Sequence, residues 1–337
     1  MKIAIIRLSA LGDIIVSASL VSCLTELFAD IEIDWFVDER FATILKPQDR
    51  VTLRILPLKR HLKNFNIKAI LKEYQELRCL SYDAVIDMQG LIKSAIIGRI
   101  LKSRYYVGFD RNSIKEPFAS FFYTHKVEIP YQDSIVRRNA KVLFEALKPS
   151  MSFDDFLSFA LKKRKQIFTY NTQDKHKILQ YLSPDKKNIL FILEASMPSK
   201  TYSSKNFIQL GRGLSNGDIS ILLLVHRDFS KAQEIFDGLK DCIEIKIISQ
   251  LDLQTIKALI DSVDLVVGGD TGITHLAWAM QKPSITLYGN TPLERFKLLG
   301  DKNIALSGNP KATYDKNDFS INKISPQQIC KYIEDIL

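Results

Sequence analysis

Short apolar runs that end in glycine or polar turns recur along the chain, and helix-like stretches follow many of them. The clearest example covers residues 262–288. There the pattern predicts a buried strand over 264–268, a tight turn over 269–272, a helix over 273–280 and another strand over 283–288. Strand, turn, helix and strand in this order form the repeating unit of parallel α/β sheets, so the pattern predicts an α/β fold.

The same pattern occurs in both halves of the chain. In the first half it predicts strands over 2–7, 31–37, 51–58, 82–88 and 105–109, with helices over 14–28, 67–80, 91–101 and 134–147. In the second half it predicts further strands over 188–193, 219–225, 243–248 and 304–306, with helices over 230–239 and 253–260. Residues 148–187 contain a basic tract and polar spacers, and we interpret them as the connection between the halves.

Two sets of similar size predict two Rossmann-like, doubly wound domains that face a central cleft. We expect an N-terminal domain over 1–165 and a C-terminal domain over 166–320. We expect a final helix over 321–337, for which one option is to pack back onto the N-terminal domain. Ser325, Pro326 and Gln328 predict the start of that helix, with a capping box.

The composition is that of a soluble globular protein. Of the 337 residues, 46% are hydrophobic and 25% are charged. No apolar run approaches the roughly 20 residues of a membrane span, and the first strand is too short for a signal peptide core. The four cysteines form no CxxC pair, which predicts reduced thiols and a cytoplasmic location.

The net charge of +9 is unevenly distributed. Residues 1–150 contain 23 Lys and Arg against 17 Asp and Glu, and the segment from Arg54 to Lys72 contains six basic residues and no acid. A basic first half favours an anionic partner such as nucleic acid, acidic lipid or a phosphorylated sugar. A solvated basic face is the alternative.

Candidate chemistry in the second half follows the predicted strand 264–268. Thr271 and Gly272 fall in the first turn of the next helix, where free amides and the helix dipole favour a phosphate. His275 lies four residues after Thr271, so the two side chains share a face. The structural alternative is that Asp270 caps this helix and His275 is a packed histidine.

Candidate chemistry in the first half follows the predicted strand 2–7. Asp13 stands at a helix start, where it can cap free amides or act as a general base at the rim of a cleft. Lys93 occupies a first helical turn, where a cation is usually disfavoured unless an anion binds. A solvated lysine remains the alternative.

Several activities lack their motifs. The dinucleotide-binding motif GxGxxG and the phosphate-loop motif GxxxxGK[ST] are absent after the first strand, which argues against an oxidoreductase and an NTPase. Asp-x-Asp, HExxH and a Cys/His cluster are absent as well. We therefore expect no metal and no cofactor, with Lys200 and the amides near Thr271 neutralising any pyrophosphate.

Three motifs together carry a resemblance. Ser9-x-x-Gly12-Asp13, Asp87-x-Gln89-Gly90-Leu91-x-Lys93-Ser94 and Asp270-Thr271-Gly272-x-x-His275 resemble those of the lipopolysaccharide-core heptosyltransferases, glycosyltransferase family 9 enzymes of the GT-B fold. The resemblance covers nearly the whole chain. The stretch from Arg111 to Tyr123 and the turn Tyr288-Gly289-x-Thr291 favour the type I over the type II enzymes of the family.

The resemblance implies a reaction and its site. ADP-L-glycero-D-manno-heptose would bind the second half, and the Kdo sugar of Kdo2-lipid A would bind the first. Asp13 would deprotonate the attacking hydroxyl, with inversion at the anomeric carbon. The implied donor-binding residues are Ser196, Lys200, Leu251, Asp270, Thr271, Gly272 and His275, and the implied acceptor-binding residues are Lys59, Arg60, Lys63, Lys93, Arg111 and Arg137.

An anionic, membrane-embedded acceptor would give the basic first half a purpose, since basic residues near a surface attract anionic lipid. We expect a cytoplasmic protein, peripheral on the inner face of the inner membrane, with a monomer as the simplest oligomeric state. The sequence departs from the family pattern at Ala195-Ser196, where Thr-Thr is common, and in the loop 226–230, which replaces a glycine-rich turn.

Other hypotheses stay open at this point. A related family member could use another donor sugar or add the second heptose. A nucleotide- or lipid-binding protein without turnover belongs to a different class. A nucleic-acid binder is the weakest hypothesis, because the basic residues lack an RNA motif and interleaved exposed aromatics.

Overall fold

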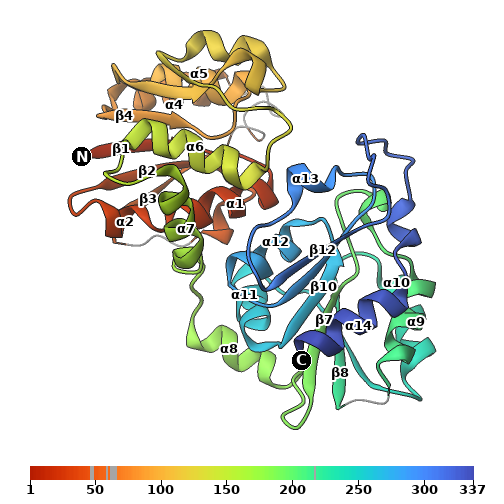
Figure 1. Cartoon of the computed structure of the whole chain (residues 1–337). Coiled ribbons are helices and arrows are strands. Elements are labelled where there is room, and N and C mark those ends of the chain that lie inside the picture. The colour runs from red at the N-terminus through yellow and green to blue at the C-terminus, as the bar shows by residue number, and fades with distance from the viewer. Residues whose placement is uncertain (46–48, 58–59, 61–66, 216–217) are drawn as a thin grey trace. The chain divides into compact units, whose positions relative to one another are not determined.

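The computed structural model describes residues 1–45, 49–57, 60, 67–215 and 218–337, and it divides into two units, Met1–Phe168 and Thr169–Leu337. Each unit is built on its own six-stranded parallel sheet with helices packed around it (Figure 1). The predicted α/β architecture of two doubly wound domains is confirmed. The boundary between the units falls after Phe168, three residues beyond the predicted position.

The first unit has the strand order β3-β2-β1-β4-β5-β6. Its strands are β1 (Lys2–Ile6), β2 (Glu32–Asp38), β3 (Val51–Leu56), β4 (Ala84–Asp87), β5 (Tyr106–Phe109) and β6 (His125–Val127). Its helices are α1 (Leu11–Val21), α2 (Leu24–Leu27), α4 (Ile67–Cys79), α5 (Ile92–Ile100), α6 (Ile135–Leu147) and α7 (Phe153–Lys163), with 3-10 turns η1 (Ala42–Ile44), η2 (Arg111–Ser113) and η3 (Pro117–Phe122).

The second unit has the equivalent order, β12-β11-β10-β7-β8-β9. Its strands are β7 (Lys187–Ile192), β8 (Ile219–Val225), β9 (Glu244–Ser249), β10 (Leu265–Gly269), β11 (Ser284–Tyr288) and β12 (Asn303–Ser307). Its helices are α8 (Thr172–Leu179), α9 (Ser204–Gly213), α10 (Phe229–Leu239), α11 (Leu253–Ser262), α12 (Gly272–Ala279), α13 (Leu293–Phe296) and α14 (Pro326–Ile336), with 3-10 turns η4 (Pro198–Lys200) and η5 (Ser320–Lys323).

The structure differs from the sequence prediction in two helical regions. The connection predicted over 148–187 contains α7 and α8 as well as the polar spacers. In α7, Phe156, Leu157 and Ala160 are buried on one face, and the basic residues occupy the helix end, where they suit its dipole. The long helix predicted over 14–28 is broken between α1 and α2 at Ser22, whose hydroxyl donates to the Ser19 carbonyl.

The final helix belongs to the second core. Ile329 and Ile333 of α14 are fully buried in the same cluster as Leu210 of α9. The apolar face of α14 therefore packs within the second unit. The option that this helix packs on the first domain is not realised through this face. The capping box predicted with Gln328 is not formed, because the Ser325 hydroxyl donates to the side chain of Gln327 instead.

We predict that Ile333→Ala lowers the free energy of unfolding of the second unit by about 2–4 kcal/mol, because it leaves a cavity between α14 and α9. The chain has two tryptophans, Trp35 in the first unit and Trp278 in the second. Urea unfolding followed by fluorescence in a Trp35→Phe background therefore reports on the second unit. Leu337→Ala, at a 37% exposed position, is the control and should change little. Equal effects of the two substitutions would contradict this packing.

Candidate functional site

Each unit has a polar half-site where the strand order reverses. In the first sheet β1 and β4 are neighbours, and their onward connections lead to opposite edges of the sheet. Ligands bind at such switch points, outside the carboxyl ends of the strands. The register places Ile6 opposite Asp87, so the loops after both strands start side by side. In the second sheet β7 and β10 have the same relation, with Ile192 opposite Gly268.

Asp13 lies in the first turn of α1, just beyond the end of β1. One carboxylate oxygen is 3.0 Å from Nη2 of Arg7, and the other accepts a hydrogen bond from the Ala10 amide at 3.4 Å. The Arg7 side chain is 5% exposed, whereas that of Asp13 is 38% exposed. The carboxylate is therefore oriented by a buried cation on one side and remains open to solvent on the other.

The loop that follows β4 supports the Asp13 loop. Oε1 of Gln89 accepts hydrogen bonds from the amides of Leu8 at 2.8 Å and Ser9 at 3.3 Å. The fully buried Asp87 carboxylate in turn accepts from the Gln89 and Gly90 amides at 2.8 and 3.1 Å. Burial raises the pKa of Asp87, although these donors act in the opposite direction. Asp87 and Gln89 thus fix the backbone that leads to Asp13.

Lys93 joins this half-site from the start of α5. Its Nζ lies 3.1 Å from the Ser9 hydroxyl, to which it donates. The structure thereby brings two of the sequence-predicted residues, Asp13 and Lys93, to the same loop. The Lys93 side chain is exposed, so its ammonium group can also bind an anionic ligand.

The other predicted acceptor residues of this unit lie on separate elements. Arg60 is exposed, with Nη2 3.3 Å from the Glu39 carboxylate. Arg111 is exposed at the start of η2, beyond the end of β5. Lys59 and Lys63 lie outside the described residues.

Arg137 of α6 has two acidic neighbours. Its guanidinium nitrogens are 3.9 Å from the Asp133 carboxylate and 3.7 Å from that of Asp154. The same group lies over the Phe153 ring, 5.3 Å from the centroid. These contacts give Arg137 a position in the fold that does not depend on a bound anion.

The second half-site centres on a buried carboxylate. Asp270, which follows β10, accepts a hydrogen bond from Nζ of Lys200, and its other oxygen is 2.9 Å from Nε2 of His275. Burial by itself would raise the pKa of Asp270. The hydrogen bond from His275 and the charge of Lys200 outweigh burial, so the pKa lies well below its usual value. Asp270 therefore positions both side chains, and Thr271 occupies the N-cap position.

Two polar atoms beside this network are buried without a partner in the described part of the chain. They are Oγ1 of Thr271 and Nδ1 of His275. Gly272 begins α12, so the first amides of that helix have no intrahelical acceptor. The Thr271 hydroxyl and the first amides therefore lie at one helix start, an arrangement that suits a phosphate group, and His275 belongs to the same helix.

The approach of two loops depends on Gly269. A Cβ at this position would lie 2.0 Å from the carbonyl oxygen of Lys200. Any other residue would push η4 away and move Lys200 from Asp270. The other two predicted donor residues follow other strands of the same sheet. Ser196 is exposed in the loop after β7, and Leu251 is half-buried in the loop after β9.

Sequence reasoning missed two supporting residues. Arg7, which orients Asp13, is one of them. The other is Glu194, whose carboxylate accepts hydrogen bonds of 2.7–2.8 Å from the amides of His226, Arg227 and Asp228. Glu194 therefore organises the loop that departs from the family pattern. The available signal was a charged residue at the carboxyl end of each unit's first strand, where open sheets bind ligands.

Two Rossmann-like units, each with polar residues at its own switch point, have the architecture of the GT-B fold. The sequence profile described as Glycosyltransferase family 9 (heptosyltransferase) matches residues 70–324, and the chain belongs to this family. The resemblance inferred from the three motifs is thereby confirmed.

Individual relatives agree with this assignment. The chain is 35% identical to lipopolysaccharide heptosyltransferase 1 of Campylobacter coli, with 100% of this chain and 99% of the relative aligned. It is 26% identical to lipopolysaccharide heptosyltransferase 1 of Escherichia coli K12, over 86% of this chain and 88% of the relative. The structure of E. coli heptosyltransferase WaaC with ADP is similar in fold, with a TM-score of 0.78, 23% identity and full coverage of both chains.

Two features are absent from the described residues. None of their helices is long and apolar enough to span a bilayer. None of their His, Cys, Asp and Glu side chains form a group of three or more that could hold a metal ion.

We predict that Asp270→Asn destabilises the chain by about 3 kcal/mol or more at neutral pH, because it leaves Lys200 without its buried counter-charge. The folded-state pKa of Asp270 lies below the unfolded value of about 3.9. The contribution of the carboxylate is therefore fully present above about pH 5 and is lost as the pH falls toward the lowered pKa. Urea unfolding at a series of pH values should show the gap between wild type and variant narrowing in acid. The exposed control Asp301→Asn should show little difference at any pH, and a pH-independent gap for Asp270→Asn would contradict the prediction.

Proposed function

We propose that this protein transfers L-glycero-D-manno-heptose from ADP-heptose to the Kdo sugar of Kdo2-lipid A, with inversion and without a metal ion. The observation that carries the proposal is the Asp13 carboxylate, oriented by Arg7 yet 38% exposed, in a family 9 chain. The relative from Campylobacter coli, a lipopolysaccharide heptosyltransferase 1 that aligns over nearly its full length, supports this choice of reaction. Matches to E. coli heptosyltransferase WaaC with ADP and with ADP-2-deoxy-2-fluoro heptose support the donor.

The second half-site would bind the donor through its diphosphate. Lys200 supplies a positive charge, and the Thr271 hydroxyl, the Gly272 amide and Nδ1 of His275 supply hydrogen-bonding groups. Asp270 acts as a positioning residue, since its two oxygens hold Lys200 and His275. Ser196 and Leu251 would complete the site, with Leu251 beside the adenine.

The chemical step needs one proton acceptor and one stabilised leaving group. Asp13 takes the proton from the acceptor hydroxyl as the hydroxyl oxygen bonds to the anomeric carbon of heptose. The bond from that carbon to the β-phosphate oxygen breaks, and ADP leaves with its electron pair. Lys200 and the α12 amides stabilise the charge that develops on ADP. Attack opposite to the leaving group inverts the configuration.

The first half-site would bind the anionic acceptor. Lys93 contacts the loop that leads to Asp13. Arg60 and Arg111 follow β3 and β5, beyond the carboxyl ends of these parallel strands. Guanidinium groups bind phosphates and carboxylates in a bidentate manner. Lys59, Lys63 and Arg137 remain further candidates. We include in the proposal that the protein works on the inner face of the inner membrane, where this acceptor would be anchored.

We expect Asp13→Asn to lower acceptor-dependent ADP release at least about 100-fold, the range typical of a general base. The assay supplies ADP-heptose and Kdo2-lipid A in EDTA, so that it also tests metal independence. ADP affinity should stay within a factor of about three, because Asp13 belongs to the other half-site. Asp30→Asn, at an exposed aspartate of the same unit, is the matched control.

The outcomes separate the alternatives. Equal release by wild type and Asp13→Asn would remove Asp13 as the base. Loss of wild-type release in EDTA would refute metal-free transfer. No release by the wild type despite ADP binding would refute this donor and acceptor pair, and panels of other sugars would follow.

We also expect Lys200→Ala to weaken ADP binding by about 10- to 100-fold, since hydrogen bonds to charged groups contribute about 1.5–3 kcal/mol. Isothermal titration with ADP measures this change directly. Lys205→Ala removes the next lysine of the chain, which is exposed on α9, and should leave the affinity unchanged. Equal affinities for wild type and Lys200→Ala would exclude Lys200 from the diphosphate site.

A further inference from the structure

Helix α4 exposes its apolar stripe. Ile67, Ile70, Leu71 and Tyr74 have the 3, 4 and 7 spacing of one helix face, yet they are 68%, 37%, 55% and 40% exposed. Leu77, farther along the same face, is the buried residue of this helix. Amphipathic helices of globular proteins normally turn such a stripe toward a core, so this face has the composition of a surface that becomes covered.

Two neighbouring elements extend the stripe into one surface. Ile92 and Ile96 of α5 are 37% and 43% exposed, and Phe118 and Phe121 of η3 are 69% and 70% exposed. Helix α5 packs against both α4 and η3, so the three elements lie side by side. We call the surface formed by the following residues the exposed apolar face: Ile67, Ile70, Leu71, Tyr74, Ile92, Ile96, Phe118 and Phe121.

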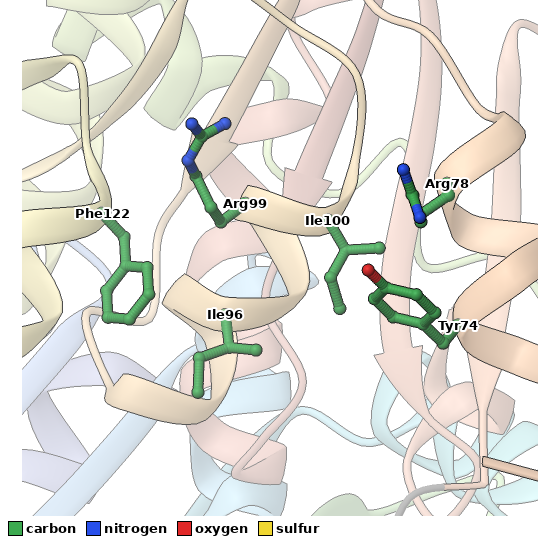
Figure 2. A pocket seen from close by; sticks show the side chains of 6 residues that line it. All are labelled: Tyr74, Arg78, Ile96, Arg99, Ile100 and Phe122. Atoms are coloured by element: carbon green, nitrogen blue, oxygen red, sulfur yellow. The ribbon is translucent and has the colours of Figure 1, made fainter. Parts of the chain in front are cut away.

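A shallow groove of about 320 Å³ crosses this face between α4, α5 and η3. Tyr74, Ile96, Ile100 and Phe122 line it together with two arginines, Arg78 and Arg99. Figure 2 shows both guanidinium groups projecting on the same side of the groove, with Ile100 between them. Apolar walls with cations along one rim match a lipid whose phosphate is anionic.

The charges around the exposed apolar face are mixed, with a basic excess. Lys68, Lys72 and Arg78 of α4 are accompanied by Glu73 and Glu76, and Glu76 is 3.8 Å from Lys72. Arg99 of α5 and Lys126 of β6 add further positive charge, the latter with Nζ 6.0 Å from the Phe121 ring centroid. An anionic surface complements this set.

We propose that the exposed apolar face docks on a bilayer of anionic phospholipid. Phe118, Phe121 and the α4 stripe would enter the boundary between headgroups and acyl chains, and Arg78 and Arg99 would bind headgroup phosphates. A second copy of this chain fits less well. Symmetric pairing would bring the same arginines of two +9 chains together, at a cost in electrostatic repulsion.

The location suits a lipid-anchored acceptor, and in this respect the inference rests on the proposed function. Helix α5 carries Lys93, which contacts the Asp13 loop, at one end and Arg99 six residues later. At 1.5 Å per residue, the two positions are about 9 Å apart along the helix axis. A sugar attached to a lipid in the docked bilayer would therefore be within reach of Asp13.

The test is flotation of the full-length protein with vesicles of phosphatidylglycerol and phosphatidylcholine, compared with vesicles of phosphatidylcholine alone. We expect binding to the anionic vesicles that decreases with salt. Phe118→Ser with Phe121→Ser should weaken it at least tenfold, and Arg78→Ala with Arg99→Ala about thirtyfold. Phe229→Ser with Phe319→Ser and Lys311→Ala with Lys316→Ala change exposed phenylalanines and exposed basic residues of the second unit, and these variants should bind as wild type does.

Several results would overturn the proposal. One is equal binding by the face variants and their controls, and another is no preference for anionic vesicles. A dimer in the absence of vesicles that Phe118→Ser with Phe121→Ser converts to monomer would identify the face as a self-interface instead. Transfer to a deacylated, water-soluble acceptor should be unaffected by the face variants. Failure of the wild type in that assay would count against the proposed function and leave the vesicle result standing.

Discussion

Pairing between the two central strands of each sheet determines where the functional side chains meet. Ile6 opposite Asp87 and Ile192 opposite Gly268 are the last paired positions at the two switch points. Beyond them the chain leaves the sheet, and its free amides need new acceptors. Gln89 accepts from the loop after β1, and Glu194 from the loop after β8. The half-sites are thus the places where strand hydrogen bonding ends and side chains continue it.

The strands could be predicted from sequence because burial on both faces makes them continuous apolar runs, as in 219–225, which matches β8. Helices α7 and α8 could not, because their local composition is charged and only three-dimensional packing buries Phe156 and Ile178. Asp13 and Asp270 could be located as polar residues in turns after strands. Arg7 and Glu194 gave a weaker signal, a charged residue just beyond each unit's first strand, because their partners are set by the three-dimensional fold or are backbone amides.

The two half-sites treat their carboxylates in opposite ways, and this difference fits a division of labour. Asp270 is buried, and its two oxygens contact Lys200 and His275, as its proposed positioning role requires. Asp13 has one buried cation beside it and a side open to solvent, as the proposed proton transfer from an incoming hydroxyl requires. A base must be reachable by its substrate, whereas a group that orients cations works best when water is excluded.

Charge and apolar exposure have to be considered together in the first unit. Eight exposed apolar residues on α4, α5 and η3 would favour aggregation in an uncharged protein. Basic residues at the rim oppose pairing of like chains while they attract anionic lipid, so the same charges can prevent one association and promote another. Helix α5 connects this surface to the Asp13 loop through Lys93. The proposed acceptor, anionic and anchored in a membrane, would contact both ends of this helix, which is consistent with the larger basic excess of this half of the chain.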